Sequence, residues 1–257
     1  MTDLHLISWN RPKMTELVIK TIHKNTPRND FRLVVLDNAS EPETVEMLQG
    51  FADNGLIDEF LPIKTNLGLE AARDLLLREA TETKRFVCVD NDCLPPLGWL
   101  DTLNILMDNS PDYAAISLRT DPMIGTGNIF EHSEEGELVD FPHPGGSYRL
   151  MNTAITRRLG GWDRHAPGRG SEERYICSKL HEAGYKTAFV NIKCLHLYGE
   201  PEKTDRWGYP REYRPEDTGH SDVWHPKFAQ GDDPEEVKQY AGEKLTNEYF
   251  NHDNSDN

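Results

Sequence analysis

The sequence predicts an α/β fold built on one doubly wound, mostly parallel sheet that is flanked by helices and followed by a C-terminal extension. Three observations support this prediction. Short apolar runs alternate with segments of helical apolar spacing over residues 3–92. The runs are continuously apolar, which is typical of strands buried on both faces of a parallel sheet. Each run ends in a polar cluster, at the edge where doubly wound sheets bind their ligands.

The first half of the chain repeats a unit of strand, loop and helix. The helical spacing is clearest in the segment that holds Leu17, Val18 and Ile22. The same patterns predict strands over residues 3–8, 31–36, 59–63 and 85–89, and helices over residues 14–23, 42–51 and 67–80.

The second half is less regular. Residues 120–146 are rich in glycine, proline and acidic residues, which predicts a loop or a small hairpin. We expect a strand over residues 147–155, then a short helix that ends at Gly160 and Gly161. A helix over residues 172–183 should end at Gly184, since glycine is the usual residue after a helix. The other predicted elements are a helix over residues 97–107 and strands over residues 113–118 and 187–197.

The character of the chain changes after residue 198. Residues 200–230 hold many prolines, charges and aromatic side chains with little periodicity, and we expect an ordered lid or wrap there. Residues 232–249 predict an acidic helix, and the polar tail that follows predicts disorder. The extension therefore covers residues 199–257.

Length and hydropathy favour one globular domain without a membrane span. A chain of 257 residues fits one decorated α/β domain better than two independent ones. No apolar stretch approaches the roughly 20 residues needed to cross a bilayer. Residues 1–9 lack the basic and then apolar profile of a secretory signal, so we expect a cytoplasmic protein. The sequence leaves its oligomeric state open.

Charge and cysteine content narrow the function classes. The net charge of -16 opposes nonspecific attraction to nucleic acid or anionic lipid, unless a local basic patch overrides it. The four cysteines show no CxxC spacing and lie in or near apolar runs, so we expect core thiols rather than disulfides or ligands. Phosphate-loop, zinc-type Cys/His and Gly-x-Ser-x-Gly motifs are absent from the sequence. It therefore gives no support for an NTPase, a zinc site or a serine hydrolase.

The strongest local signal for chemistry is the Asp90-Asn91-Asp92 segment, which directly follows an apolar strand. Alternate side chains at a strand end point the same way, so the two carboxylates can share one cation. Oxygen ligands suit a hard divalent ion that bridges a diphosphate. A solvated acidic turn is the alternative interpretation.

The order of several motifs over residues 3–198 resembles family 2 GT-A glycosyltransferases. Residues 8–12, Ser-Trp-Asn-Arg-Pro, are similar to the family loop that cradles the donor nucleotide. Residues 34–40, Val-Val-Leu-Asp-Asn-Ala-Ser, resemble its second strand and acidic loop. Residues 66–74 resemble Asn-x-Gly-x-x-x-Ala-Arg-Asn, with Asp74 in the last place. The resemblance implies a donor-nucleotide site made of Ser8, Asn10, Arg11, Asp37, Asn38, Asn66, Gly68, Arg73, Asp90 and Asn91.

The resemblance also implies a cation site for Mn²⁺ or Mg²⁺. Asp90-Asn91-Asp92 is similar to the family's Asp-x-Asp motif, with Asp92 as the direct ligand. Asp90 then contacts the ribose, metal-bound water or the metal itself. His196 lies where the family often has a histidine that completes the site, although a lone histidine is more often structural.

The catalytic base is implied by a series of motifs further along. Gly-Gly-Trp-Asp at residues 160–163, Glu172-Glu173, and Leu-His-Glu-Ala-Gly-Tyr at residues 180–185 resemble the family series, with Glu173 and Lys179 as departures from Asp and Arg. In inverting members this acidic pair supplies the general base. We assign the role to Glu173, with Glu172 as the rival. Alternatively, the two acidic residues stand in the first turn of a helix only because negative charge there interacts favourably with the helix dipole.

The resemblance implies a hexosyl- or pentosyltransferase that uses a nucleotide-diphosphate sugar, UDP-linked in our expectation, with inversion. Residues 1–97 would form the nucleotide-sugar-binding half of a GT-A domain over residues 1–198, and residues 98–198 the acceptor and catalytic half. We expect a bacterial glycan or polysaccharide acceptor. The candidate acceptor contacts, which core packing explains almost as well, are Trp162, Arg149, Trp207 and Tyr209.

Three alternatives stay open at this point. A viral glycosyltransferase, acting in the host cytoplasm on hydroxymethylated bases in DNA, would use a basic patch formed by Arg206, Arg211, Arg214 and Lys227. A nucleotidyltransferase would share the paired acids but needs a basic glycine-rich loop. A noncatalytic nucleotide-sugar-binding module would keep the fold without the chemistry.

Overall fold

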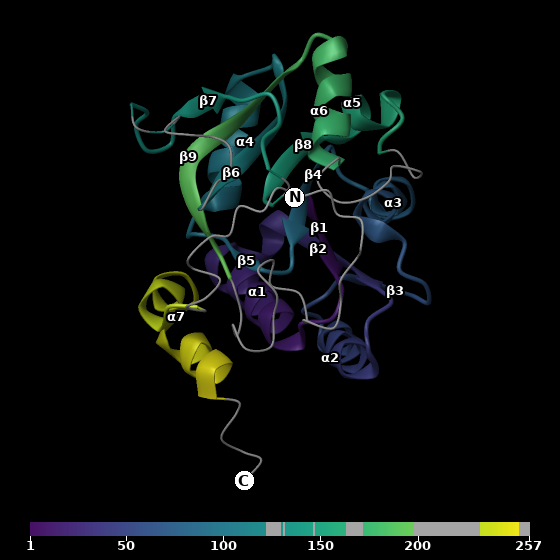
Figure 1. Cartoon of the computed structure of the whole chain (residues 1–257), viewed down its shortest axis with the longest axis vertical. Helices are drawn as coiled ribbons and strands as arrows, with labels where there is room; N and C mark the ends of the chain where they lie inside the picture. The colour runs from purple at the N-terminus through teal and green to yellow at the C-terminus, as the bar shows by residue number, and fades with distance from the viewer. Residues whose placement is uncertain (122–129, 131, 146, 163–171, 198–231, 252–257) are drawn as a thin grey trace, which may run out of the picture.

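Nine strands form one sheet in the computed structural model, which describes residues 1–121, 130, 132–145, 147–162, 172–197 and 232–251 (Figure 1). The strands are β1 (Thr2–Ser8), β2 (Phe31–Asn38), β3 (Glu59–Ile63), β4 (Arg85–Asp90), β5 (Cys93–Leu94), β6 (Tyr113–Asp121), β7 (Leu138–Asp140), β8 (Arg149–Asn152) and β9 (Lys186–His196). Their order is β3-β2-β1-β4-β8-β6-β9-β5, and β7 also pairs with β9.

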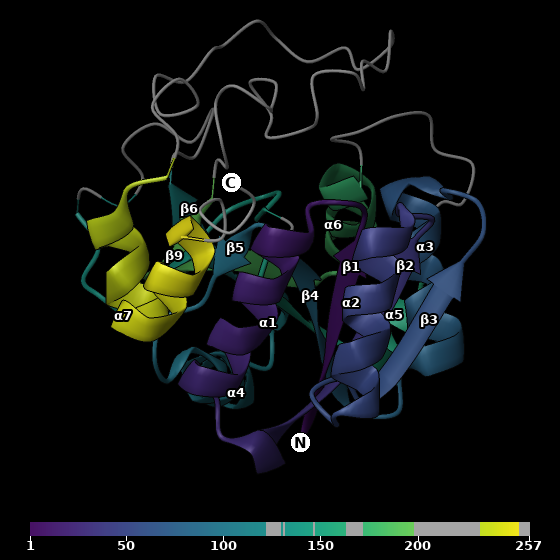
Figure 2. The same ribbon diagram turned by 90° about the horizontal axis from the view of Figure 1, so that it is seen from below.

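Helices connect the strands and cover the sheet (Figures 1 and 2). They are α1 (Pro12–Asn25), α2 (Pro42–Asp53), α3 (Gly68–Leu75), α4 (Trp99–Asn109), α5 (Thr153–Arg158), α6 (Glu172–Glu182) and α7 (Pro234–Asn251), with short turns η1 (Arg28–Asp30) and η2 (Leu76–Ala80). The described residues thus follow the α/β order that the sequence predicts.

The first four long strands are parallel, as predicted. β1 pairs in parallel with β2 and β4, and β2 pairs in parallel with β3. Beyond β4 the sheet is mixed, because β8 runs antiparallel to both β4 and β6 while β6 and β9 are parallel. The short strands β5 and β7 run antiparallel to β9.

Apolar side chains fill both faces of the sheet, because successive residues of a strand point to opposite sides. On one face, Leu4 and Leu6 of β1 belong to a cluster with buried residues of α1, α2, α4 and α7. On the other face, Ile7 packs with residues of α3. Phe86 and Cys88 of β4 share a third cluster with α6.

Two predicted elements differ in extent from the structure. The strand predicted over residues 147–155 covers only β8, because Asn152 caps α5 and its side chain accepts a hydrogen bond from the Ile155 amide at 3.0 Å. The helix predicted over residues 67–80 ends in the π turn η2. There the Thr81 hydroxyl donates to the Leu76 carbonyl at 3.0 Å.

The acidic segment predicted as one helix near the C-terminus is α7, which is kinked at Gly242 and packs against α1 (Figure 2). Lys20 pairs with Glu248 at 2.8 Å, and Asn25 donates to the Tyr240 carbonyl at 3.1 Å. The predicted lid over residues 200–230 and the predicted disordered tail lie outside the described residues. Within the described part of the chain, no helix is both long and apolar enough to cross a membrane.

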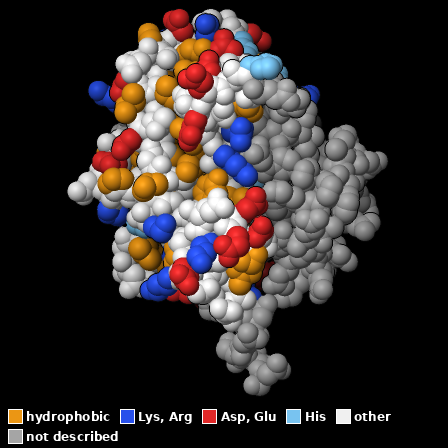
Figure 3. All heavy atoms as spheres, turned by 90° about the vertical axis from the view of Figure 1, so that its left-hand side faces the viewer, with side chains coloured by type: hydrophobic (Ala, Val, Ile, Leu, Met, Phe, Trp, Pro, Cys, Tyr) orange, Lys and Arg blue, Asp and Glu red, His pale blue; other side chains and the backbone are white. Residues whose placement is uncertain are grey.

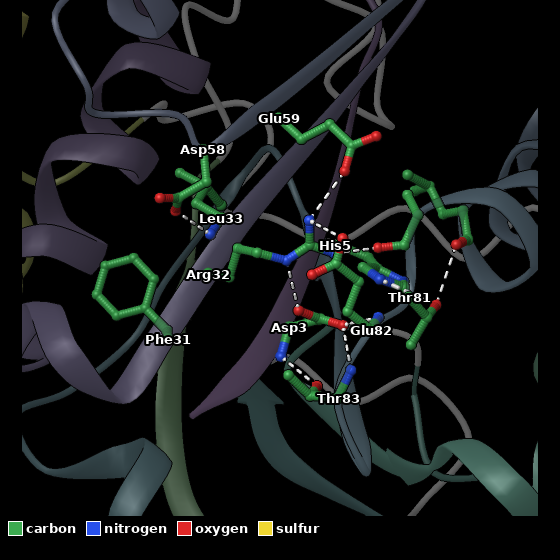
Figure 4. Close-up of polar contacts among 12 residues, drawn as sticks. Asp3, His5, Phe31, Arg32, Leu33, Asp58, Glu59, Thr81, Glu82 and Thr83 are labelled. Carbon is green, nitrogen blue, oxygen red and sulfur yellow. Dashed lines mark hydrogen bonds and ion pairs between the residues drawn. The ribbon is translucent and has the colours of Figure 1, made fainter.

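A buried ion cluster fastens the sheet at the edge where β1 and β2 begin (Figure 4). The Asp3 carboxylate is fully buried and accepts hydrogen bonds from Arg32 Nε at 2.9 Å, the Glu82 amide at 2.6 Å and the Thr83 amide at 3.0 Å. Arg32 also pairs with Glu59 of β3 at 2.9 Å. Burial alone would raise the pKa of Asp3, but the hydrogen bonds, led by that from Arg32, lower it below its ordinary value.

We predict that Asp3→Asn lowers the free energy of unfolding by about 2 kcal/mol at pH 7, because Arg32 and two amides lose a charged acceptor. A lowered folded-state pKa stabilises the fold above the unfolded value and loses this effect as pH falls through the folded value. The difference from wild type should therefore be constant between about pH 5 and 7 and shrink below about pH 4. Urea unfolding at several pH values measures it.

The exposed carboxylate of Glu46 supplies the control. Glu46→Gln should change the unfolding free energy by less than about 0.5 kcal/mol. Equal stability of Asp3→Asn and Glu46→Gln would contradict the role given to the Asp3 cluster.

Candidate active site

The strand register brings the predicted site residues to one edge of the sheet. Ser8 at the end of β1 lies opposite Asp37 of β2, and Ile7 lies opposite Asp90 of β4. Since parallel strands end at the same edge, the polar groups that follow β1, β2 and β4 meet there. This edge is opposite the Asp3 cluster along the strands.

Asp37 offers a buried acceptor that the described residues leave unused. Its Oδ2 accepts from the Ser40 amide at 3.0 Å, whereas its Oδ1 has no hydrogen-bond partner among the described residues. The Ser8 hydroxyl beside it is also buried without a partner there. Burial raises the pKa of Asp37. Buried polar atoms are nearly always paired, so these two point to a polar ligand.

The loops after β1 and β2 are held in an unusual conformation. Asn10, Arg11 and Ala39 have φ values of 55°, 59° and 66° without being glycine. The loops hold one another, since the Asn10 amide donates to Ser40 Oγ at 2.7 Å and Asn10 Oδ1 accepts from the Glu41 amide at 2.9 Å. Such backbone strain persists only where the surroundings fix it, and it gathers at functional sites.

Three of the predicted donor residues use their side chains to fasten loops. Asn38 donates to Asn66 Oδ1 at 3.0 Å and accepts from the Leu67 amide at 2.9 Å. Asn66 Oδ1 also accepts from the Gly68 amide at 2.8 Å, where α3 begins. Asn91 is buried and donates to Thr15 of α1 at 3.0 Å. These amides shape the site rather than face into it.

Asp92 lies at the centre of a possible cation site. Its Oδ2 is 2.7 Å from Arg11 Nη1 and 3.8 Å from His196 Nε2. Burial alone would raise the pKa of Asp92, but the charges of His196 and Arg11 outweigh it and lower the pKa. An ionised carboxylate and an imidazole fit a divalent ion such as Mn²⁺. Arg11 provides the positive charge beside Asp92 in the structure.

Cys93 belongs to the same cluster, which the sequence did not suggest. Its thiol lies 3.6 Å from Asp92 Oδ1, and possible ligand atoms of Asp92, Cys93 and His196 all lie within 4.8 Å of one another. Cys93 is also 1% exposed and part of the hydrophobic core, as expected of a core thiol. The available signal was its place directly after the Asp-x-Asp motif.

Asp90 points to a different partner. Its Oδ1 accepts from Arg73 Nη2 at 2.8 Å, and it is not part of the three-residue cation cluster. Burial raises the pKa of Asp90, Arg73 opposes this rise, and the charges of Asp92 and Glu172 add to it. Of its predicted roles, contact with the ribose or with metal-bound water fits this placement better than direct ligation.

Glu172 is locked into a buried ion network. Its Oε2 accepts from Arg149 Nη2 at 2.8 Å and from Trp162 Nε1 at 3.0 Å, and its Oε1 lies 3.5 Å from Arg73 Nε. Glu172 is only 1% exposed. Burial would raise the pKa of Glu172, but the two guanidinium groups lower it. Arg73 therefore joins Asp90 to Glu172.

Two of the predicted acceptor contacts, Arg149 and Trp162, belong to this buried network instead. Arg149 is fully buried and Trp162 is 2% exposed, and both support Glu172 from beneath the site. Their burial argues against a surface that meets an acceptor. The other two candidates, Trp207 and Tyr209, lie outside the described residues.

Glu173 has the opposite electrostatic character although it is the next residue on α6. It is partly exposed, and burial together with the neighbouring charge of Glu172 raises its pKa to about 8. A carboxyl group with such a pKa exchanges protons near neutral pH. The pair thus divides into Glu172, which the guanidinium groups keep ionised, and Glu173, which keeps its proton up to about neutral pH.

Gly161 lets Trp162 reach this network. Its φ is 63°, and an added Cβ would lie 2.5 Å from Asp74 Oδ1 and 3.0 Å from Leu77 Cδ2. Asp74 is buried and pairs with Arg78 at 2.9 Å, so it cannot move aside freely. The Gly-Gly-Trp motif of the sequence therefore has a steric cause.

Comparison with known proteins places the chain in a family. Residues 4–170 match the family model described as glycosyl transferase family 2. No curated protein sequence matches the chain.

Several solved structures share its fold. The mannosyltransferase PcManGT from Pyrobaculum calidifontis, in complex with GDP-Man and Mn²⁺, has a TM-score of 0.61 and 20% identity over 76% of this chain and 56% of that one. GalNAc-T7 with UDP, GalNAc and Mn²⁺ has a TM-score of 0.66 and 17% identity over 76% and 43%. Residues 1–349 of S. aureus TarS with UDP-GlcNAc have a TM-score of 0.61 and 15% identity over 78% and 60%. The chain matches only about half the length of these structures, and the likeness confirms the GT-A fold.

We predict that Gly161→Ala destabilises the protein by about 1 to 3 kcal/mol more than Gly184→Ala does. Both positions have positive φ, 63° and 86°, so both variants bear the same backbone penalty. Only Gly161 has atoms close to the added methyl group, whereas nothing lies within 4 Å at Gly184. Thermal or urea unfolding measures the difference, and equal losses would show that the packing against Asp74 is unimportant.

Proposed function

The chain belongs to glycosyl transferase family 2 and is a glycosyltransferase by family, and we propose that it moves a sugar from a UDP-sugar to an acceptor hydroxyl with inversion. One observation carries this proposal: the ends of β1, β2 and β4 hold an acceptor at Asp37 that is unused among the described residues and a cation cluster at Asp92, and Arg73 links Asp90 there to Glu172, the neighbour of Glu173. Asp37, Asp92 and Glu173 would supply the three groups that such a transfer needs.

The Asp37 carboxylate supports a donor whose base presents a ring N–H. Its free Oδ1 can accept a hydrogen bond from the imide N–H of uracil. Cytosine has an unprotonated ring nitrogen at that position, whose lone pair would face the carboxylate. Guanine also carries a ring N–H, so a guanosine donor is the alternative outcome of the test below.

Asp92 and His196 are the residues that would hold Mn²⁺ or Mg²⁺. When bound, such an ion offsets the negative charge that develops on the departing diphosphate. Arg11 and Arg73 add positive charge at the same edge, since they lie 2.7 Å from Asp92 and 2.8 Å from Asp90. Solved relatives of the fold contain Mn²⁺ together with their nucleotides, which agrees with this assignment.

Glu173 would act as the general base. It takes the proton of the acceptor hydroxyl while the hydroxyl oxygen bonds to the anomeric carbon. The bond from that carbon to the diphosphate oxygen breaks on the opposite side, and its electron pair leaves with the nucleotide diphosphate. A pKa of about 8 suits this role, because the base is strong and still largely available at mildly alkaline pH.

We further propose a glycan or polysaccharide acceptor, bound by residues 98–198 while residues 1–97 hold the donor. Figure 3 shows acidic and basic side chains interspersed on the described part of one face. A surface with both signs of charge does not produce the strong positive potential that attracts a polyanion such as DNA. The basic residues proposed for DNA contact lie outside the described residues. We keep the cytoplasm as the proposed location.

The test is slow donor hydrolysis in the presence of Mn²⁺ with UDP-, GDP-, TDP- and CDP-sugars. We expect a UDP-sugar to be hydrolysed, and Asp92→Asn to lower the rate by at least about 100-fold, since a ligand matters more than its supporting residues. The control is Asp101→Asn, which alters an exposed carboxylate on α4.

If none of the donors is hydrolysed, with or without Mn²⁺, the transferase proposal fails and the nucleotide-sugar-binding module remains. Preference for a CDP-sugar would contradict the role of Asp37, and hydrolysis unaffected by a chelator or by Asp92→Asn would contradict the cation site.

A further inference from the structure

The cation cluster differs in composition from a site made only of oxygen and nitrogen ligands. Three side chains contribute to it, namely Cys93 of β5, His196 of β9 and Asp92 in the turn directly before β5, and one of them is a thiol. The metal assignment of the proposed function uses Asp92 and His196 and gives no role to Cys93, a core residue whose thiol donates to Asp92 Oδ1.

Strand pairing directs Cys93 and His196 toward the same place. β5 and β9 are antiparallel, and Cys93 lies directly opposite His196 while Leu94 lies opposite Leu195. Directly opposite residues of an antiparallel pair project on the same face, with Cβ atoms about 5 Å apart. The Leu197 amide donates to the Asp92 carbonyl at 2.7 Å, which extends this pairing by one step. The backbone therefore fixes all three residues.

The distances suit a small ion between the three side chains. Asp92 Oδ1 is 3.6 Å from the Cys93 sulfur, and Asp92 Oδ2 is 3.8 Å from His196 Nε2. Ligands at 2.0 to 2.3 Å from a tetrahedral zinc ion are separated from one another by about 3.3 to 3.8 Å. These two separations match that geometry, and the Cys93 sulfur lies within 4.8 Å of a ring nitrogen of His196.

Burial places the thiol at the floor of the cluster. Cys93 is 1% exposed, whereas the side chains of Asp92 and His196 are 15% and 27% exposed. An ion would enter past the carboxylate and imidazole and meet the sulfur last. Any ion must displace Arg11 from Asp92 Oδ2, but this cost is common to all divalent ions and does not decide between them.

We propose that Cys93 is a third ligand of this cluster, so that the site binds thiophilic ions such as Zn²⁺ and Cd²⁺ in preference to Mn²⁺ and Mg²⁺. The reason is the soft thiolate, which selects zinc-like ions, whereas carboxylate and water suit magnesium and manganese. The sulfur–metal bond forms as the thiol proton leaves to solvent. The proposal rests on the cation site of the proposed function, and it makes zinc a competitor of the activating ion.

The test is a titration of the reduced, metal-free protein with Cd²⁺, followed by the ultraviolet charge-transfer absorption of a cadmium–thiolate bond. We expect one strong site in the wild type. Cys93→Ser should abolish the charge-transfer band and weaken Cd²⁺ binding by at least about 10-fold, while Mn²⁺ binding changes by less than about threefold. Zn²⁺ should displace bound Mn²⁺ from the wild type.

Two control variants separate the sources of sulfur. Cys177→Ser changes a buried thiol on α6 that is outside the cluster, and it should leave the band unchanged. Cys194→Ser changes the buried thiol that lies two residues before His196 on β9. The proposal would be overturned if Cys93→Ser kept the charge-transfer band. It would equally be overturned if only Cys194→Ser lost that band. Thermal unfolding of each variant confirms that it is folded.

The two proposals can fail separately. Donor hydrolysis that depends on Mn²⁺ and Asp92, without a cadmium–thiolate band, would refute the thiol ligand and keep the transferase. A band that requires Cys93, together with no reaction of any donor, would keep the thiol ligand and refute the proposed reaction.

Discussion

The site depends on one buried interaction, the contact of Glu172 with Arg149 and Arg73. Arg73 comes from α3 in the first half of the chain and Arg149 from β8 in the second, so the pair joins the two halves at α6. Buried ion pairs are expensive to desolvate and are strongly destabilised when one partner is lost. The network therefore holds Glu172 in place, and Glu173 follows it directly on α6.

The same interaction divides the work between two adjacent carboxylates. The guanidinium groups keep Glu172 ionised, and that fixed negative charge then makes a second charge at Glu173 costly. On the other side of the edge, Asp92 has Arg11 as its partner at a more exposed position. Glu172 is thus a buried anion held by two guanidinium groups, whereas Asp92 is a more exposed anion paired with one.

Much of the fold was predictable from local patterns, because continuously apolar strands such as β2 and β4 mark a parallel sheet. The Asp-x-Asp turn was predictable for the same reason, since it directly follows such a strand. The extent of β8 was not, because the cap at Asn152 ends it within an apolar run. Side-chain partners were also not predictable. Arg149 was a candidate acceptor contact, and only the pairing of β8 with β4 shows that it faces a buried network. Cys93 was expected in the core and is there, but its position opposite His196 follows only from the pairing of β5 with β9.

The most direct test compares Glu172→Gln with Glu173→Gln in two assays, urea unfolding and donor turnover as a function of pH. The account predicts that Glu172→Gln lowers the unfolding free energy by about 3 to 5 kcal/mol. Glu173→Gln should keep wild-type stability but lose at least about 100-fold in turnover, and with it the rise in rate that wild type shows toward pH 8. A stable Glu172→Gln without turnover, beside an active Glu173→Gln, would reverse the two roles and contradict the account.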